Sequence, residues 1–94
     1  MASVRGYLKA VKDYVKDRDK ASIAVVEGES IEVFKAFVNK WRDLGFYPSC
    51  FKMPSDEVLE ITVRKMVIYE IDAPESTKEK ARAWLLSRGY DLKI

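Results

Sequence analysis

The amino-acid sequence predicts an α+β fold of the ferredoxin-like type, a split βαβ arrangement (βαββαβ) with an antiparallel sheet and an additional N-terminal amphipathic helix. Three observations predict it. Apolar residues alternate along residues 58–71, apolar residues recur at helical spacing in segments on both sides of that stretch, and the order strand, helix, Trp, Gly, aromatic occurs twice. Because 94 residues suffice for one domain, we expect a basic N-terminal helix over residues 1–20 and an α+β core over residues 21–94.

Residues 3–19 predict the N-terminal amphipathic helix. Its apolar side chains recur at helical spacing, at Val4, Leu8, Val11 and Val15. A basic ridge follows the same spacing on one flank, at Arg5, Lys9, Lys12 and Lys16. Residues 1–20 carry a net charge of +3 and residues 21–94 a net charge of −1, so the positive excess lies on this helix. The ridge is either a solvated flank, whose lysine stems cover the edge of the core, or a binding surface.

A strand and a second helix are predicted next. Residues 22–27 form a nearly continuous apolar run rich in β-branched residues and stopped by Gly28, which is typical of a strand buried on both faces. Residues 30–44 repeat apolar groups at helical spacing, and Gly45 followed by Phe46 is typical of a helix C-terminus. The aromatic residues of this helix sit at core spacing, and we interpret them as packing residues: Phe34, Phe37 and Trp41.

The middle of the chain predicts a β-hairpin. Residues 46–53 read as an edge strand, because the proline within them cannot donate a ladder hydrogen bond. Residues 54–57 supply turn-forming side chains, and residues 58–71 follow as the central strand. A turn at Arg64 and Lys65 would instead split this strand into a second hairpin. Neither residue favours the positive φ of a tight hairpin turn, so one long or bulged strand is the preferred interpretation.

The C-terminal segment predicts a third helix and a last strand. Residues 72–88 begin with two candidate capping boxes and continue with apolar residues at helical spacing. Gly89 and Tyr90 repeat the helix end seen at the second helix. Leu92 and Ile94 then alternate with charged residues, which predicts a short final strand.

The composition argues against an enzyme. The chain has no histidine, the usual general base near neutral pH and a common metal ligand, and its acids form no catalytic dyad or metal cage. The single cysteine, Cys50, has no histidine to activate it and fits a reducing compartment. We therefore expect a cytoplasmic protein with no catalytic residue, metal or cofactor. The absence of glutamine and the abundance of Lys and Glu indicate a thermophilic source.

The distribution of basic and aromatic residues predicts a nucleic-acid-binding protein without sequence specificity. Cations beside aromatic rings suit single strands, because phosphates pair with lysine and bases stack on rings. The candidate residues combine the basic ridge with a basic and aromatic cluster near one sheet edge: Arg5, Lys9, Lys12, Lys16, Tyr47, Phe51, Lys52, Arg64 and Lys65. A single strand is the preferred partner, and the choice between DNA and RNA stays open.

The alternative function is a protein interaction or oligomerisation module. It would use the apolar stripe of the first helix with Tyr7 and Tyr14 as anchors, since tyrosine is favoured at interfaces. The longest apolar runs are far shorter than the roughly 20 residues of a membrane span, so no membrane partner is expected.

Overall fold

The computed structural model describes residues 4–93 and, among their side chains, those from residue 6 onward. It contains four helices: α1 (Val4–Val26), α2 (Glu32–Asp43), α3 (Asp56–Tyr69) and α4 (Glu75–Ser87). No strand occurs between residues 4 and 93. The protein is therefore all-α over its described length, and the prediction of an α+β ferredoxin-like fold is wrong.

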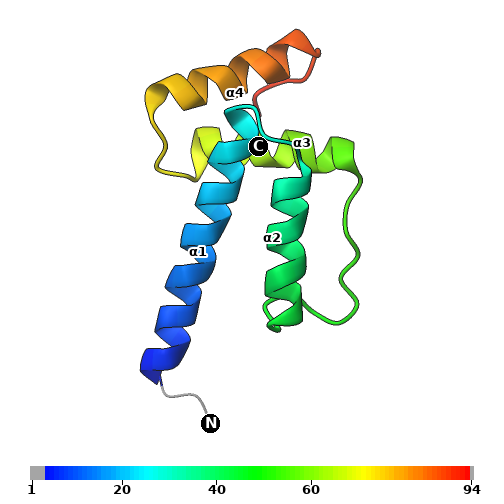
Figure 1. Cartoon of the computed structure of the whole chain (residues 1–94). Helices are drawn as coiled ribbons and strands as arrows, with labels where there is room; N and C mark the ends of the chain where they lie inside the picture. The colour runs from blue at the N-terminus through cyan, green and yellow to red at the C-terminus, as the bar shows by residue number, and fades with distance from the viewer. Residues whose placement is uncertain (1–3, 94) are drawn as a thin grey trace.

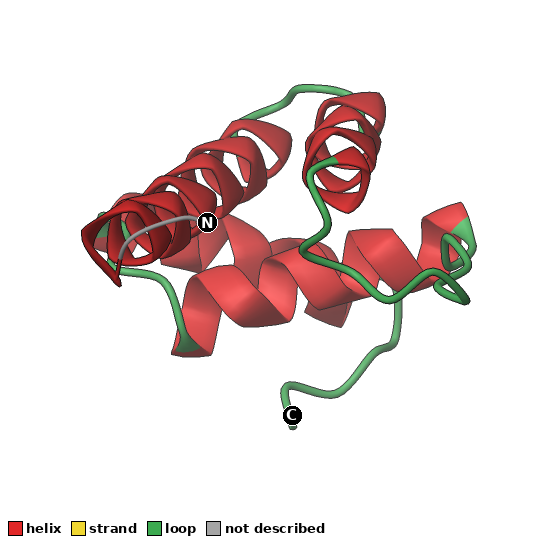
Figure 2. Ribbon diagram, turned by 90° about the horizontal axis from the view of Figure 1, so that it is seen from below, coloured by secondary structure: helices red, strands yellow, loops and turns green. Residues whose placement is uncertain are grey.

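The four helices form two pairs that cross (Figure 1). α1 and α2 run antiparallel, and α3 and α4 lie across the end of this hairpin where α1 finishes and α2 begins. A long irregular segment, residues 44–55, returns from the far end of α2 to the start of α3 (Figure 2). The N-terminal half of α1 therefore projects away from α3 and α4. Three of the four residues of the predicted basic ridge lie in this half: Arg5, Lys9 and Lys12.

Residues 22–27, the first predicted strand, are the C-terminal end of α1 and the turn that follows. Ser22 and Val25 are buried, and the Ser22 Oγ donates to the Arg18 carbonyl at 2.8 Å. α1 ends at Val26, Gly28 follows with a φ of +123°, and the N–H of Glu29 donates back to the Ala24 carbonyl at 2.9 Å. The apolar run is continuous because this last stretch of α1 is covered by the other helices, which overrides its strand propensity.

Residues 58–71, the predicted central strand, lie mostly within α3. Ser55 caps the helix by accepting from the Val58 N–H at 3.3 Å, and acidic residues occupy the first turn, where they favour a helix N-terminus. The alternative turn at Arg64 and Lys65 is also wrong, since both lie in the middle of α3. The alternation misled because the buried residues of α3 include Leu59, Val63 and Val67, whose spacing of four satisfies a strand and a helix equally.

Residues 46–53, the predicted edge strand, are irregular. The N–H of Phe51 donates to the Pro48 carbonyl at 2.9 Å, which closes a turn rather than a ladder. Residues 54–57, expected to turn a hairpin, lead into α3. Residues 90–93 are irregular as well, so the predicted final strand is absent there, and Ile94 lies outside the described residues.

The second and third predicted helices are present as α2 and α4, and each ends as expected. Gly45 (φ +88°) and Gly89 (φ +79°) adopt the left-handed conformation. The next residue then bonds back to the carbonyl five positions earlier, from Phe46 to Trp41 at 2.9 Å and from Tyr90 to residue 85 at 3.0 Å. The repeat noticed in the sequence is thus a repeated helix end rather than a repeated strand and helix.

The core consists of two adjoining clusters. The first lies among α1, α2 and the start of α3, and its buried members are Ala21, Val25, Ile31, Phe34, Phe37, Val38, Trp41, Leu59 and Val63. The second lies between α3 and α4, and its buried members are Val67, Ile68, Ile71, Ala81 and Leu85. The aromatic residues of α2 are therefore core residues, as the sequence predicted.

Candidate binding surface on the first helix

The rotation of α1 about its axis is set by Tyr14. Its ring lies 5.3 Å from that of Phe37, 5.4 Å from that of Trp41 and 5.2 Å from that of Phe46, measured between ring centroids. Ala21 lies on the same face of α1 and is buried. The face that packs on the core is therefore the face of Tyr14, and side chains half a turn away from it point outward.

The predicted basic ridge points outward from this face. Lys12 and Lys16 stand two residues to either side of Tyr14, which places them about 160° around the helix axis from it. Lys9, Lys12 and Lys16 are exposed, and none of the ion pairs between described side chains includes them. Arg5 lies within α1, but its side chain is outside the described residues.

Lys20 continues this row and was missed by the sequence analysis. The helix was expected to end near Asp19, whereas α1 continues to Val26, so Lys20 follows Lys16 by one helical turn. It is exposed and makes no ion pair with a described side chain. If residues 22–27 had been interpreted as helix rather than strand, Lys20 would have been placed on the basic ridge. We use the name lysine ridge for Lys9, Lys12, Lys16 and Lys20.

The acidic residues of α1 are mostly engaged elsewhere. Asp17 Oδ2 accepts from Lys40 Nζ at 2.9 Å and from Trp41 Nε1 at 3.1 Å. These bonds, with that from Lys40 foremost, hold the pKa of the Asp17 carboxyl below its usual range. Asp19 pairs with Arg18 at 3.1 Å. Asp13 is exposed and makes no ion pair within the described chain, so it is the acid that offsets the lysine ridge most directly.

Tyr47 and Phe51, the predicted stacking residues, pack against the first core cluster. The hydroxyl groups of Tyr47 and Tyr14 are hydrogen-bonded at 2.7 Å, and the rings of Tyr47 and Phe51 lie 4.7 Å apart. Burial, followed by the bond to Tyr14, raises the pKa of the Tyr47 hydroxyl well above its usual range. The two rings pack against each other and against the core, so neither presents an open face on which a base could stack.

The predicted basic residues of α3 have structural partners. Arg64 is buried, and its Nη1 donates to the Glu60 carbonyl at 3.0 Å and to Glu60 Oε2 at 2.5 Å. Its guanidinium lies 3.8 Å from the ring centroid of Trp84, and burial lowers its pKa. Lys65 pairs with Asp91 at 3.5 Å and also donates to a carbonyl of the C-terminal segment. Neither side chain is available as part of an open cationic cluster.

Lys52 is the remaining predicted residue. It is exposed in the segment between α2 and α3 and makes no ion pair with a described side chain. The predicted interface is therefore divided: the lysines of α1 form one continuous outward row, whereas Tyr47, Phe51, Arg64 and Lys65 serve the packing of the fold.

A second outward feature of α1 is an apolar stripe, which we define as Leu8, Val11 and Val15. None of the three belongs to either core cluster or to the apolar residues packed against them. The stripe does not face the core, because Tyr14 and Ala21 occupy the core-facing side of α1. Val4, which belonged to the predicted stripe, has a side chain outside the described residues.

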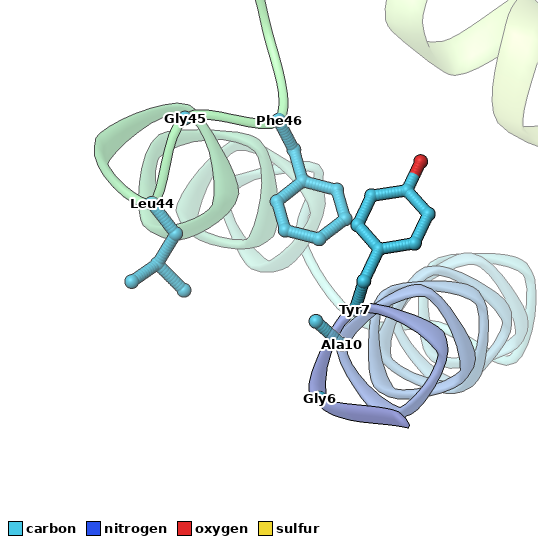
Figure 3. A pocket seen from close by; sticks show the side chains of 6 residues that line it. All are labelled: Gly6, Tyr7, Ala10, Leu44, Gly45 and Phe46. Atoms are coloured by element: carbon cyan, nitrogen blue, oxygen red, sulfur yellow. The ribbon is translucent and has the colours of Figure 1, made fainter. Parts of the chain in front are cut away.

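The groove between the N-terminal half of α1 and the end of α2 is apolar and open. It encloses about 430 Å³ and is lined by Gly6, Tyr7, Ala10, Leu44, Gly45 and Phe46. Figure 3 shows the Tyr7 side chain reaching from α1 toward Phe46, with Leu44 on the other side of that ring. A more polar groove of about 470 Å³ follows along the same helices and contains Asp13, Lys16, Asp17 and Lys40. Neither groove has an arrangement of acids and bases that suggests catalysis.

The described residues offer no grouping of three or more Cys, Asp or Glu side chains that could hold a metal ion. Cys50 is exposed in the segment before α3. Among residues 4–93, every helix is too short or too polar to cross a membrane. Comparisons of the chain with protein-family models, with curated proteins and with solved structures find no match.

Proposed function

We propose that the protein binds nucleic acid through phosphate groups, without sequence specificity and without catalysis, using the lysine ridge of α1. The observation that carries this proposal is a row of four exposed lysines on one side of one helix, without ion pairs to described side chains. From Lys9 to Lys20 the row spans about 16 Å of helix axis. Each lysine that neutralises a phosphate releases condensed counterions, which favours binding at low salt.

The position of the aromatic rings changes the preferred form of nucleic acid. The preference for single strands depended on Tyr47 and Phe51 as stacking surfaces, and both rings are partly buried against the first core cluster. A rigid row of cations without rings is better matched to the dense and regular phosphates of a duplex. We therefore propose that a duplex binds more tightly than a single strand of the same length.

The experiment is a salt series with a fluorescently labelled 20-base-pair duplex and its single strand, followed by anisotropy. If all four lysines contact phosphates, the log–log slope of affinity against salt is about −3.6 for the duplex. Replacing two ridge residues, Lys9→Glu with Lys16→Glu, reduces affinity at least tenfold and lowers the magnitude of the slope by about 2. No binding at low salt contradicts the proposal.

A matched control separates the ridge from net charge. Lys78 and Lys93 lie on α4 and near the C-terminus and make no ion pair with described side chains. The variant Lys78→Glu with Lys93→Glu changes the net charge by the same amount, and we expect its affinity to fall much less. Equal losses in the two variants would mean that overall charge, not the ridge, causes binding. Both variants should retain the melting temperature, because exposed charges contribute little to folding.

A protein interaction module is the second candidate function, and one observation favours it. The apolar stripe of Leu8, Val11 and Val15 lies outside both core clusters, where a protein partner could cover it. The lysine ridge supports nucleic-acid binding, whereas the stripe next to it requires a different chemistry.

A further inference from the structure

The apolar stripe of α1 is a continuous surface rather than a set of scattered residues. Leu8 is 52% exposed and Val15 is 38% exposed, and the half-buried Val11 lies between them in the sequence and on the same side of the helix. Single exposed apolar residues are normal on a protein surface, but neighbours along one helix face mark an interaction site more often. The surface extends over two helical turns, which is the length that a partner helix contacts through two or three of its own apolar residues.

The groups that border the stripe are positively charged. Lys12 follows Leu8 by four residues and precedes Val15 by three, so it is a neighbour of both on the helix surface. Lys16 follows Lys12 by one helical turn and also lines the groove that contains Asp13 and Asp17. The nearest acid on this side, Asp19, is already paired with Arg18 at 3.1 Å. Asp13 lies toward the groove between α1 and α2, together with Asp17. The stripe is therefore an apolar surface beside two lysines, Lys12 and Lys16, that make no ion pair with a described side chain.

This charge decides between the possible occupants. If a second copy covered the stripe by pairing α1 with α1, the two cationic borders would approach each other, and like charges across an interface cost several kcal/mol. A partner with acidic residues beside its apolar residues gains at the same positions. Charge complementarity thus favours an acidic amphipathic helix over a second copy of this chain.

We infer that the Leu8, Val11 and Val15 stripe docks an acidic amphipathic helix of a partner protein. The apolar side of that helix covers the stripe, and its Asp or Glu side chains pair with Lys12 and Lys16. An interface of two helical turns is small, so binding is transient, with a Kd on the order of micromolar or weaker. The apolar groove beside Tyr7 and Leu44 lies on the other flank of α1 and takes no part.

The first test uses two synthetic helical peptides with the same leucine face. One carries Glu on both flanks and the other carries Lys, and each is titrated as a dye-labelled probe with the full chain. We expect the Glu peptide to bind and the Lys peptide not to bind. The variant Leu8→Ser with Val15→Ser should bind the Glu peptide at least tenfold more weakly than the parent does. Equal binding of both peptides would show non-specific adhesion and overturn the inference.

The chain offers a matched control for these substitutions. Leu86 on α4 is 59% exposed and Val33 on α2 is 37% exposed, close to the values for Leu8 and Val15. The variant Leu86→Ser with Val33→Ser removes the same side chains at similar exposure but away from α1. It should bind the Glu peptide as the parent does. An equal loss in this variant would place the binding elsewhere.

A charge reversal tests the border. The variant Lys12→Glu with Lys16→Glu should no longer bind the Glu peptide and should now bind the Lys peptide. A structural defect cannot produce that exchange.

Light scattering of the free protein adds a separate outcome: a dimer that disappears in the Leu8→Ser, Val15→Ser variant would overturn the inference in favour of a second copy. The Leu8→Ser, Val15→Ser variant should still bind the labelled duplex. If it does not, the stripe belongs to the nucleic-acid surface and the inference fails.

Discussion

Asp17 of α1 and Trp41 of α2 are joined by a hydrogen bond in which the indole Nε1 donates to the carboxylate at 3.1 Å. Lys40 donates to the same oxygen at 2.9 Å, and the edge of Trp41 meets the ring of Tyr14 at 5.4 Å between centroids. These contacts hold one side of α1 against α2. They thereby determine that the opposite side, with the lysine ridge, faces solvent.

The first prediction concerns the pH dependence of stability. The pKa values of the Asp17 and Glu27 carboxyl groups are lowered from ordinary values of 3.8 and 4.5, chiefly by hydrogen bonds from Lys40 and Lys80 respectively. A lowered pKa in the folded state means that the unfolded state takes up protons first as the pH falls. The stabilisation is therefore complete above about pH 5 and is lost as the pH falls through the folded values.

The measurement is the melting temperature of Asp17→Asn and of the parent between pH 7 and pH 2. At pH 7 we expect the variant to melt about 3 °C lower, from a loss of roughly 0.5 kcal/mol for a partly exposed pair. The difference should shrink as the solution is acidified. Asp13→Asn, which removes an acid that makes no ion pair with a described side chain, is the control and should leave the melting temperature at pH 7 unchanged. A constant difference at every pH would contradict the assignment.

The second prediction compares two adjacent leucines of α4. Leu85 is fully buried in the second core cluster, whereas Leu86 is exposed. Leu85→Ala should cost about 2–5 kcal/mol of unfolding free energy, since it removes buried apolar atoms and leaves a cavity. Leu86→Ala should change it by no more than about 0.5 kcal/mol. Urea denaturation of both variants measures this, and similar losses would mean that α4 is rotated relative to the structure.

The third prediction concerns Arg64, whose guanidinium lies against the ring of Trp84. Arg64→Ala should cost about 2 kcal/mol, because it removes a packed side chain and leaves the Glu60 carboxylate without its partner. Arg64→Lys keeps the charge but loses the flat contact with the ring, so it should be intermediate. Denaturation followed by tryptophan fluorescence reports both. Arg42→Ala, an exposed arginine without an ion pair to described side chains, is the control and should be neutral.

This series also tests the role that the sequence suggested for Arg64. A variant that remains folded, such as Arg64→Lys, should bind duplex with the parent's affinity and salt slope. If a folded Arg64 variant no longer bound duplex, Arg64 would be part of the nucleic-acid-binding surface.

The fourth prediction concerns the helix end at Gly45. Its φ of +88° is unfavourable for a residue with a Cβ, although a Cβ there would meet no atom within 4 Å. Gly45→Ala should therefore cost about 1 kcal/mol through backbone strain alone. Gly45→Asn should cost less, because asparagine tolerates the left-handed conformation better. If calorimetry finds the two variants equally stable, the strain argument is wrong.

Some features of this protein follow from the sequence alone. Gly45 with Phe46 and Gly89 with Tyr90 predicted where α2 and α4 end, because a left-handed glycine and the bonds it permits are local. The lysines of α1 share one side of the helix by their spacing, whatever they face. For the same reason, the aromatic residues of α2 could be assigned to a core before its partners were known.

Local signals for the other helices were present but had competing interpretations. Gly28 ends α1, and Ser55 with two acids after it begins α3. Both signals were outweighed by β-branched residues and by apolar groups four positions apart. That spacing advances a strand by two full repeats and a helix by one turn and about 40°, so the pattern itself does not distinguish them.

Only the tertiary structure decided which side of α1 is buried and what the candidate site contains. Tyr14 faces the core because the rings of Phe37, Trp41 and Phe46 surround it, and that segment lies more than 20 residues from Tyr14 in the sequence. In the same way, tertiary contacts engage two residues of the predicted site. Tyr47 is hydrogen-bonded to Tyr14, and Arg64 is held by Glu60 of α3 and by the ring of Trp84 of α4. An exposed and a buried side chain of the same type look identical in a sequence, because burial depends on which partners the folded chain brings within contact.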